Sequence, residues 1–194
     1  WSVEYYEQFE QRLGISYDKH YFESELLEQS LKLVDEHMDK VFESSQGAVI
    51  FPGEKYGLHT RVFVNQHGNP TYEAKDVGLI STKRDDFKFD HSVVMTGNEQ
   101  NDYWRVITKV TEIIFPDLVG KVQHLGYGMI NLSTGKMSSR TGNIVTAFGL
   151  VDMVKEQVRA FVQANREYDD KQTEEISEAV GMAAIRYSFL KKAA

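Results

Sequence analysis

The residues with the clearest potential for chemistry lie in a loop at positions 133–143, directly after an apolar run. This loop carries two cations, Lys136 and Arg140, and no acid, although the whole chain has a formal net charge of −7. Hydroxyl side chains accompany the cations, and Gly135 and Gly142 allow the backbone to bend on either side of them. This combination predicts a loop that binds a polyphosphate and stabilises its charge during a reaction. The alternative is a solvent-exposed turn that carries two cations.

Two common phosphate-binding motifs do not account for this loop. A P-loop requires glycine five positions before the glycine of the Gly-Lys pair and a hydroxyl residue after the lysine, but those positions hold Ile130 and Met137. A dinucleotide-binding fingerprint fails because Asn131 stands where Gly126-Tyr127-Gly128 would need a third glycine. The histidines show no metal-ligand spacing, and the chain has neither a cysteine nor a Gly-x-Ser-x-Gly sequence. We therefore expect no metal site in the protein and no nucleophilic side chain.

A second group of polar residues could bind a guanidinium. Tyr72 and Asp76 are four positions apart, and we expect them to span the end of a strand and the following turn. Gln100 is expected at the start of a helix that follows Gly97. A carboxylate and an amide at the ends of two strands can hold a guanidinium, the carboxylate through two parallel charge-assisted hydrogen bonds. From spacing alone, the alternative is structural: Asp76 caps a helix and Gln100 is a solvated helix-start residue.

The elements that must position these residues form an α/β pattern. Residues 91–96 are a short apolar run that predicts a buried parallel strand, and a helix with a continuous apolar face follows over residues 99–115. Strand, glycine turn and helix make the βα unit of a doubly wound sheet, in which ligands bind at the carboxyl ends of the strands. Residues 122–132 predict one or two further strands that lead into the basic loop.

The flanking segments give less regular predictions. Before the βα unit we expect helices over 1–13 and 24–42, a small meander with strands at 48–51, 61–64 and 72–74, a helix from Asp76 to Thr82 and a charged loop over 84–89. After the basic loop we expect helices over 150–164 and from Thr173 onward. The last helix has an apolar face with little sequence left to cover it.

Composition bounds the class of protein. A chain of 194 residues with 41% hydrophobic residues can form one domain, or one domain and part of another. The absence of cysteine excludes disulfides and fits a cytoplasmic protein. No apolar run approaches the roughly 18 residues of a membrane span, and the acidic, aromatic start is not a signal peptide. Because the chain begins at Trp1 without an initiator methionine, we expect a piece of a longer protein. Separately, we expect the protein to be a monomer.

The basic loop resembles a known signature. Residues 136–140, Lys-Met-Ser-Ser-Arg, resemble the Lys-Met-Ser-Lys-Ser loop of class I aminoacyl-tRNA synthetases. The longer run 128–143 resembles the form found in arginyl-tRNA synthetases, in which the second lysine is often missing and an arginine is followed closely by Gly-Asn. Here Ser139 replaces that lysine, and Arg140 supplies the second cation.

Two further segments carry the same resemblance. Residues 72–76, Tyr-Glu-Ala-Lys-Asp, resemble the Tyr-Ala-Thr-Arg-Asp segment of arginyl-tRNA synthetases, with departures at Ala74 and Lys75. Residues 97–99, Gly-Asn-Glu, resemble the Gly-x-Asp turn by which class I synthetases approach the ATP ribose, and Glu99 is one methylene longer than that aspartate. Many members of the family carry histidine where this chain has Tyr103.

The resemblance implies a fold and a division of the chain. The fold class would be α/β, a partial Rossmann-like parallel sheet with an inserted α+β segment and the start of a C-terminal helical domain. Residues 1–70 would be the inserted, connective-peptide-like segment. Residues 71–148 would form the second half of the catalytic domain with its signature loop, and residues 149–194 would lead into the anticodon-binding domain.

The resemblance also implies a reaction, the formation of arginyl-adenylate from arginine and Mg²⁺-bound ATP and the transfer of arginine to the 3′ end of tRNA(Arg). The implied roles are arginine binding by Tyr72, Asp76 and Gln100, ATP binding by Gly97, Glu99, Met129 and Ile130, pyrophosphate contact by Lys136, loop anchoring by Ser138 and assistance by Arg140. No His-x-Gly-His sequence occurs, so we expect an N-terminal part of the same polypeptide to be missing and this piece to be inactive alone.

Two other functions stay open at this point. A synthetase-like module that lost catalysis would still bind arginine or tRNA. In an unrelated phosphate-binding α/β domain, Tyr72, Asp76 and Gln100 would not converge in space.

Overall fold

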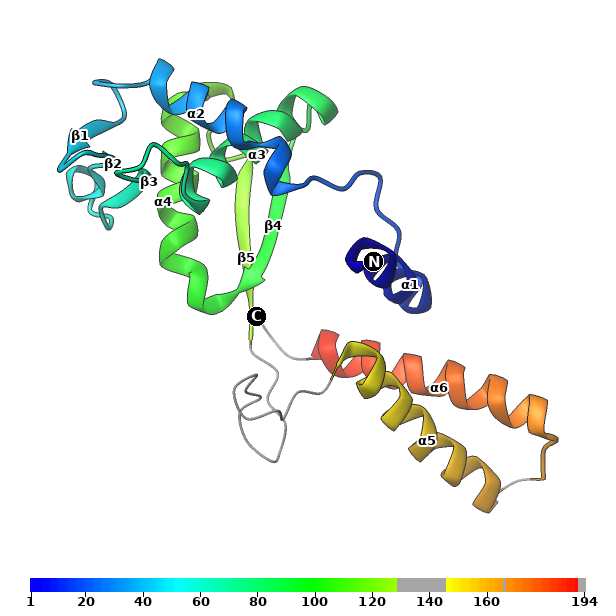
Figure 1. Cartoon of the computed structure of the whole chain (residues 1–194). Coiled ribbons are helices and arrows are strands. Elements are labelled where there is room, and N and C mark those ends of the chain that lie inside the picture. Colours follow the sequence, from blue (N-terminus) through cyan, green and yellow to red (C-terminus); the bar gives the residue numbers. More distant parts are fainter. Residues whose placement is uncertain (129–145, 166, 192–194) are drawn as a thin grey trace. The chain divides into compact units, whose positions relative to one another are not determined.

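The computed structural model describes residues 1–128, 146–165 and 167–191 (Figure 1). The basic loop therefore lies outside the described residues, as do Met129 and Ile130. Contacts divide the chain into two compact units. One unit comprises residues 19–128, and the other joins residues 1–18 to the described residues after position 145.

The unit of residues 19–128 begins with α2 (Leu27–Glu36) and a small antiparallel sheet. Its strands are β1 (Glu43–Ser45), β2 (Ala48–Phe51) and β3 (Arg61–Val64), hydrogen-bonded in the order β1-β2-β3. Gln46 and Gly47 join β1 to β2, and both have positive φ angles, 49° and 80°. Two such residues make the tight turn whose twist suits a hairpin.

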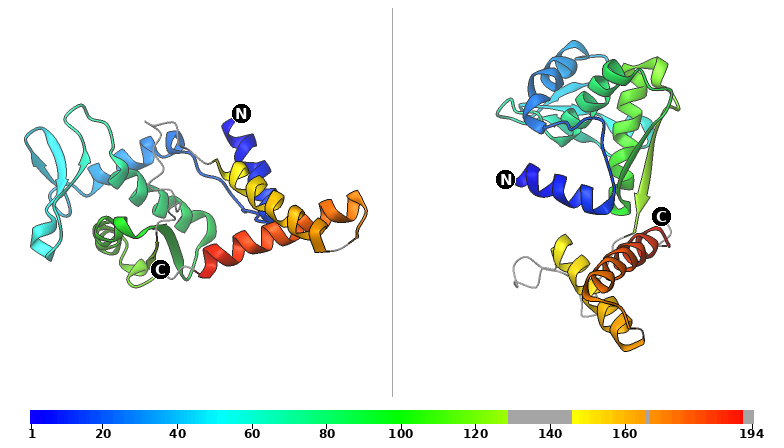
Figure 2. Two further views of the ribbon diagram at one scale, coloured as in Figure 1. Left: turned by 90° about the horizontal axis from the view of Figure 1, so that it is seen from below. Right: turned by 90° about the vertical axis from the view of Figure 1, so that its right-hand side faces the viewer.

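A parallel βαβ arrangement follows in the same unit. Its elements are α3 (Tyr72–Phe87), β4 (Ser92–Gly97), α4 (Asn101–Ile114) and β5 (Val122–Tyr127). β4 and β5 pair in parallel, in register from Ser92 with Val122 to Gly97 with Tyr127. Figure 2 shows the small antiparallel sheet, in cyan, at one end of this unit and the parallel strands, in green, away from it. The predicted α/β class and the predicted parallel sheet are confirmed.

The core of this unit is built on the apolar face of α4. Val106, Ile107 and Val110 are fully buried there, and they belong to one cluster with Phe42, Phe51 and Phe63 of the antiparallel region. Within the described part of this unit, the opposite face of the parallel sheet carries apolar side chains that are 40–62% exposed: Val93, Met95, Leu125 and Tyr127. The two sheets thus share one core, which fixes β3 relative to α3 and α4.

The predicted strand at 72–74 is wrong, and so is the placement of Asp76 as a helix cap. α3 begins at Tyr72, and Thr71 stands at its N-cap with extended backbone angles. Thr71, like aspartate, suits a helix start, and the Glu-Ala-Lys sequence that follows favours helix over strand. α3 also continues to Phe87, through most of the predicted charged loop.

The predicted helix over 24–42 is interrupted and ends early. A 3₁₀ turn over Glu23–Glu25 precedes α2, and α2 ends at Glu36. Beyond it the chain turns at Asp39, whose φ is 64°, and inserts Phe42 into the core. The helical spacing of apolar residues therefore continued past the helix because buried turn residues must be apolar too.

The second unit is a helical hairpin with a third helix against it. Its elements are α1 (Ser2–Leu13), α5 (Ala147–Asn165) and α6 (Asp170–Lys191). Val151, Met182 and Ile185 are buried between α5 and α6, and Phe9 and Leu13 of α1 pack on them. Among the described helices of both units, none combines the length and the apolar composition needed to cross a membrane.

An ion-pair network holds α1 to this hairpin, and it predicts that the attachment of α1 weakens in acid. Arg12 pairs with Glu178 at 2.9 Å and with Asp152 at 3.0 Å, and Lys155 also reaches Glu178 at 3.1 Å. The hydrogen bond from Arg12 is the main cause that lowers the pKa of Glu178 from 4.5 to about 2. Since the pKa of Glu178 is lower in the folded state, the ionised Glu178 contributes fully to the stability of this unit above pH 4.5. That contribution is lost as the pH falls towards 2.

We therefore expect amide hydrogen exchange of α1 to accelerate, after correction for intrinsic rates, as the pH falls through this window. Glu178→Gln should remove most of that dependence and lower the stability of the unit by about 1 kcal/mol at neutral pH. The exposed Glu175 offers the matched control, because its replacement by glutamine removes a charge on the same helix without touching Arg12. If the exchange of α1 still accelerated in acid in Glu178→Gln, Glu178 would not be the group responsible.

Candidate functional site

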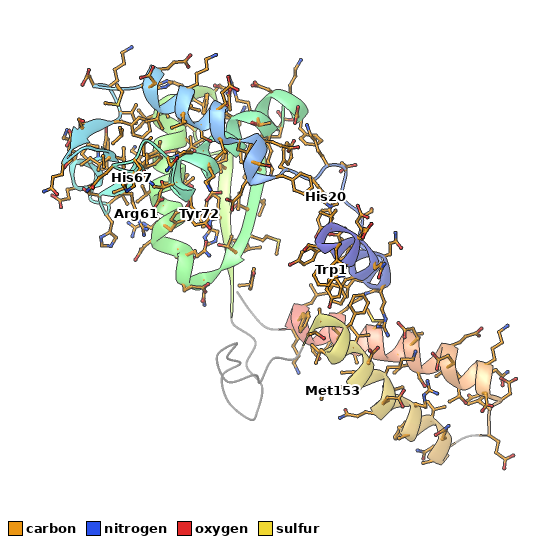
Figure 3. The ribbon with its side chains drawn as sticks, in the orientation of Figure 1. Trp1, His20, Arg61, His67, Tyr72 and Met153 are labelled. Carbon is orange, nitrogen blue, oxygen red and sulfur yellow. The ribbon has the colours of Figure 1, made fainter. Side chains whose placement is uncertain are left out.

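A pocket of about 510 Å³ lies where β3, α3 and the β4–α4 junction meet. Its lining consists of polar and charged side chains: Arg61, Tyr72, Glu73, Asp76, Glu99, Gln100 and Tyr103. The structure thus brings together Tyr72, Asp76 and Gln100, the three residues of the guanidinium hypothesis. Figure 3 shows two members of the lining, Arg61 and Tyr72, labelled beside one another in this unit.

The start of α3 is fixed by its attachment to β3. The N–H of Thr71 donates to the carbonyl of Phe63 at 2.9 Å, and its hydroxyl donates to the carbonyl of Val62 at 2.7 Å. Tyr72 and Asp76 follow in the first turns of the helix, and residues four apart lie on the same helix face. Both residues line the pocket, but their common element is one helix rather than the predicted strand and turn.

The opposite wall comes from the 3₁₀ turn Asn98–Gln100, directly after β4. Gly97 ends the strand, and a Cβ atom there would lie 2.3 Å from the carboxylate oxygens of Glu99. A Cβ on Gly126, in the neighbouring strand, would lie 3.1 Å from the Cα of Asn98. Both glycines therefore let the turn sit close to the ends of the parallel strands, and this position brings Glu99 and Gln100 into the pocket.

Asp76 is the central charged group of the pocket. Burial raises its pKa above the ordinary 3.8, and a hydrogen bond from the hydroxyl of Tyr103 acts in the opposite direction. Burial and the nearby Asp76 carboxylate together raise the pKa of the Tyr103 phenol, so it remains a hydrogen-bond donor. The arrangement is a desolvated carboxylate, oriented by a phenol, that gains from the approach of a cation.

Tyr103→Phe is expected to raise the pKa of Asp76 further, because the hydrogen bond that favours its ionised form is lost while burial remains. The measurement is a pH titration of the Asp76 carboxyl carbon by NMR. Tyr56→Phe is a suitable control, since Tyr56 lies outside this pocket. A pKa of Asp76 that does not move would show that the phenol does not act on it.

Two other charged residues in the first turns of α3, Glu73 and Lys75, have partners of their own. Lys75 donates to Glu23 at 2.6 Å, and its ammonium lies 4.7 Å from the ring centre of Tyr72. Glu73 pairs with Arg61 at 3.4 Å. The sequence analysis missed Arg61 and Glu73 as members of the pocket. For Glu73, the pattern that could have indicated it is its spacing of three from Asp76, which places both residues on one face of a helix.

The other predicted site residues are only partly described. Glu99 lines the pocket, and Gly97 ends β4 directly before the turn that carries Glu99. The others, Met129, Ile130, Lys136, Ser138 and Arg140, lie outside the described residues. Across the described ranges, no group of three or more histidine or carboxylate side chains is arranged to hold a metal ion.

The chain resembles known proteins over nearly its whole length. A sequence profile of the family described as "tRNA synthetases class I (R), catalytic domain" matches residues 2–194. An arginine–tRNA ligase of Porphyromonas gingivalis is 27% identical over 198 residues, which cover 98% of this chain and 33% of the relative. One from Amoebophilus asiaticus is 30% identical, with 93% and 31% covered.

Solved structures show the same fold. The arginyl-tRNA synthetase of Plasmodium falciparum matches all of this chain and 33% of its own with a TM-score of 0.80 at 17% identity. That of Thermus thermophilus gives a TM-score of 0.71 at 18% identity over 94% of this chain and 37% of its own. The chain thus spans about a third of the length of the curated relatives named above. Its sequence places it in the family of class I synthetase catalytic domains of the arginine type.

Proposed function

We propose that this chain is part of an arginine–tRNA ligase and that its pocket binds the side chain of arginine. The observation that carries the proposal is the convergence of Tyr72, Asp76 and Gln100 on one cavity. Asp76 offers the ionised acceptor for a planar guanidinium, and Tyr72 and Gln100 offer oxygen acceptors from the two walls. Family membership and the names of the relatives point to the same ligand.

The proposed reaction needs no nucleophilic side chain. The carboxylate of arginine attacks the α-phosphorus of ATP, pyrophosphate leaves, and arginyl-adenylate forms; the 3′-terminal ribose of tRNA(Arg) then takes the arginyl group and AMP leaves. Catalysis of such a step rests on positioning and on stabilising the transferred charge. ATP enters as its Mg²⁺ complex, and that ion belongs to the substrate.

The remaining roles are proposed on the resemblance alone. The contacts to ATP would come from Gly97, Glu99, Met129 and Ile130. Lys136 would contact the pyrophosphate oxygens, Ser138 would anchor the loop, and Arg140 would assist Lys136. The division into an inserted segment (1–70), a catalytic half (71–148) and helices leading to an anticodon-binding domain (149–194) has the same basis. The monomeric state, the cytoplasmic location and the need for an N-terminal part of the polypeptide are likewise proposals.

We expect the isolated 194-residue chain to bind arginine weakly without activating it. Addition of L-arginine should shift the NMR signals of the Gln100 side chain and of the first turn of α3 in a saturable way. Citrulline, which replaces the guanidinium by a neutral urea of nearly the same shape, should not. Pyrophosphate exchange with arginine and ATP should stay at background.

Equal binding of citrulline and arginine would refute guanidinium recognition. Substantial exchange would refute the need for further parts of the polypeptide.

A further inference from the structure

The pocket contains a guanidinium that belongs to the chain itself. Arg61, at the start of β3, places its Nη1 atom 3.4 Å from the Oε1 of Glu73. The same guanidinium lies 5.4 Å from the ring centre of Tyr103, within reach of a cation–π contact. The side chain of Arg61 is 33% exposed and that of Glu73 only 14%, so the pair closes part of the pocket wall.

This pair changes the charge that a ligand meets. Among the described residues that line the pocket, Glu73, Asp76 and Glu99 carry carboxylates and Arg61 carries the one cationic side chain. The charge of Glu73 also acts on Asp76 and helps to raise its pKa. Because Glu73 and Asp76 are three positions apart on one helix face, an unpaired Glu73 would stand as a second acceptor one turn from the first.

Two adjacent carboxylates and a single carboxylate select different cations. A planar guanidinium fits one carboxylate through parallel hydrogen bonds, with further acceptors at fixed positions around it. A primary ammonium is a compact point charge with rotatable donors, and it can sit between two carboxylates without such geometry. A pocket that exposed both Glu73 and Asp76 would therefore lose its preference for the planar group.

We propose that Arg61 is a specificity-determining residue: by pairing with Glu73 it leaves Asp76 as the α3 carboxylate that receives the ligand, so that the pocket prefers a guanidinium to an ammonium. The proposal deepens the proposed function and rests on it. Arginine suits position 61 better than lysine, because its flat group can pair with Glu73 and lie over Tyr103 at once.

A merely structural ion pair would behave differently. A partly exposed pair contributes little to stability, and its loss would weaken the binding of every ligand alike. The ratio of two dissociation constants separates these cases, because general loosening of the pocket cancels in the ratio.

The test titrates the 194-residue chain with two probes, N-ethylguanidinium and n-butylammonium, which carry the end groups of arginine and lysine. Protein NMR at constant ionic strength gives a dissociation constant for each. Arg61→Gln should lower the preference for the guanidinium about tenfold, mainly through tighter binding of the ammonium. Arg61→Met, which keeps an aliphatic stem of similar length without the guanidinium, should do the same, so the comparison does not depend on one folded variant.

Removing the second carboxylate supplies the control. Glu73→Gln and the double variant Arg61→Gln/Glu73→Gln should both keep the preference of the unaltered chain. An unchanged ratio in both Arg61 variants would overturn the inference and leave the proposed function standing, as would a double variant that behaves like Arg61→Gln. Failure of the unaltered chain to bind N-ethylguanidinium would overturn both.

Discussion

Replacing Asp76 by asparagine should weaken the binding of arginine by about a hundredfold, the largest effect expected of any change in the pocket. The loss of one partner from a hydrogen-bonded charge pair costs roughly 2–5 kcal/mol, because the other charge is left desolvated and unpaired. Asparagine keeps the size of the side chain and one acceptor for Tyr103, so the fold should survive. NMR titration with L-arginine gives the measurement.

Asp102 provides the matched control for this variant. It lies in the first turn of α4, outside the pocket, and pairs with Arg105 on the surface. Asp102→Asn makes the same chemical change and should leave arginine binding within about twofold. Equal effects of the two replacements would mean that overall charge, not the pocket, determines affinity.

The raised pKa of Asp76 gives a second readout of the same prediction. Binding of a guanidinium requires the ionised carboxylate, so affinity should fall as the pH decreases through the raised pKa. Because burial places that pKa above 3.8, the loss should begin at a higher pH than for an exposed aspartate. In Asp76→Asn the remaining weak binding should not show this step.

Gly78→Ala is expected to destabilise the unit of residues 19–128 by about 1–3 kcal/mol, although alanine is the better helix former. Gly78 faces α2 from α3, and a Cβ there would lie 2.4 Å from the Oγ of Ser30, which is fully buried and donates to the carbonyl of Leu26 at 2.6 Å. Two closely packed helices cannot separate without disturbing the core. Denaturant unfolding followed by the fluorescence of the buried Trp104 reports on this unit.

A second replacement, in α2, should restore the stability lost in Gly78→Ala. Ser30→Ala removes the atom nearest to the added methyl group, so Gly78→Ala in that background should recover most of the lost stability. Gly181 of α6 is the control, since a Cβ there would stay 3.4 Å or more from its neighbours. Destabilisation of the double variant equal to that of Gly78→Ala would place the clash elsewhere.

The sequence predicted the parallel sheet and the polar residues around it better than it predicted the start of α3. The regular apolar faces of β4 and α4 carry their own periodicity, and Gly97 marks the turn between them. Tyr72 and Asp76 were expected to approach Gln100, and the pocket contains all three, although their helix had been read as strand and turn. An aspartate is as good a cap as Thr71, so local preference could not decide between the two.

Arg61 shows what local patterns cannot give. Its place in the pocket depends on the packing of the antiparallel sheet against α3, through contacts such as those of Thr71 with β3. Those contacts join two elements that were predicted separately, and neither contained a signal for the other. The roles of Met129, Ile130 and the cationic loop remain predictions from resemblance, because they lie outside the described residues.

The exposed apolar side chains on one face of the β4–β5 pair, those of Val93, Met95, Leu125 and Tyr127, have a consequence for how the protein behaves in solution. Parallel strands are ordinarily shielded on both sides, and bare hydrocarbon of this kind is adhesive in water. Concentrated samples of the isolated polypeptide should therefore scatter light and broaden NMR lines, and dilute, cool preparations will suit the titrations best.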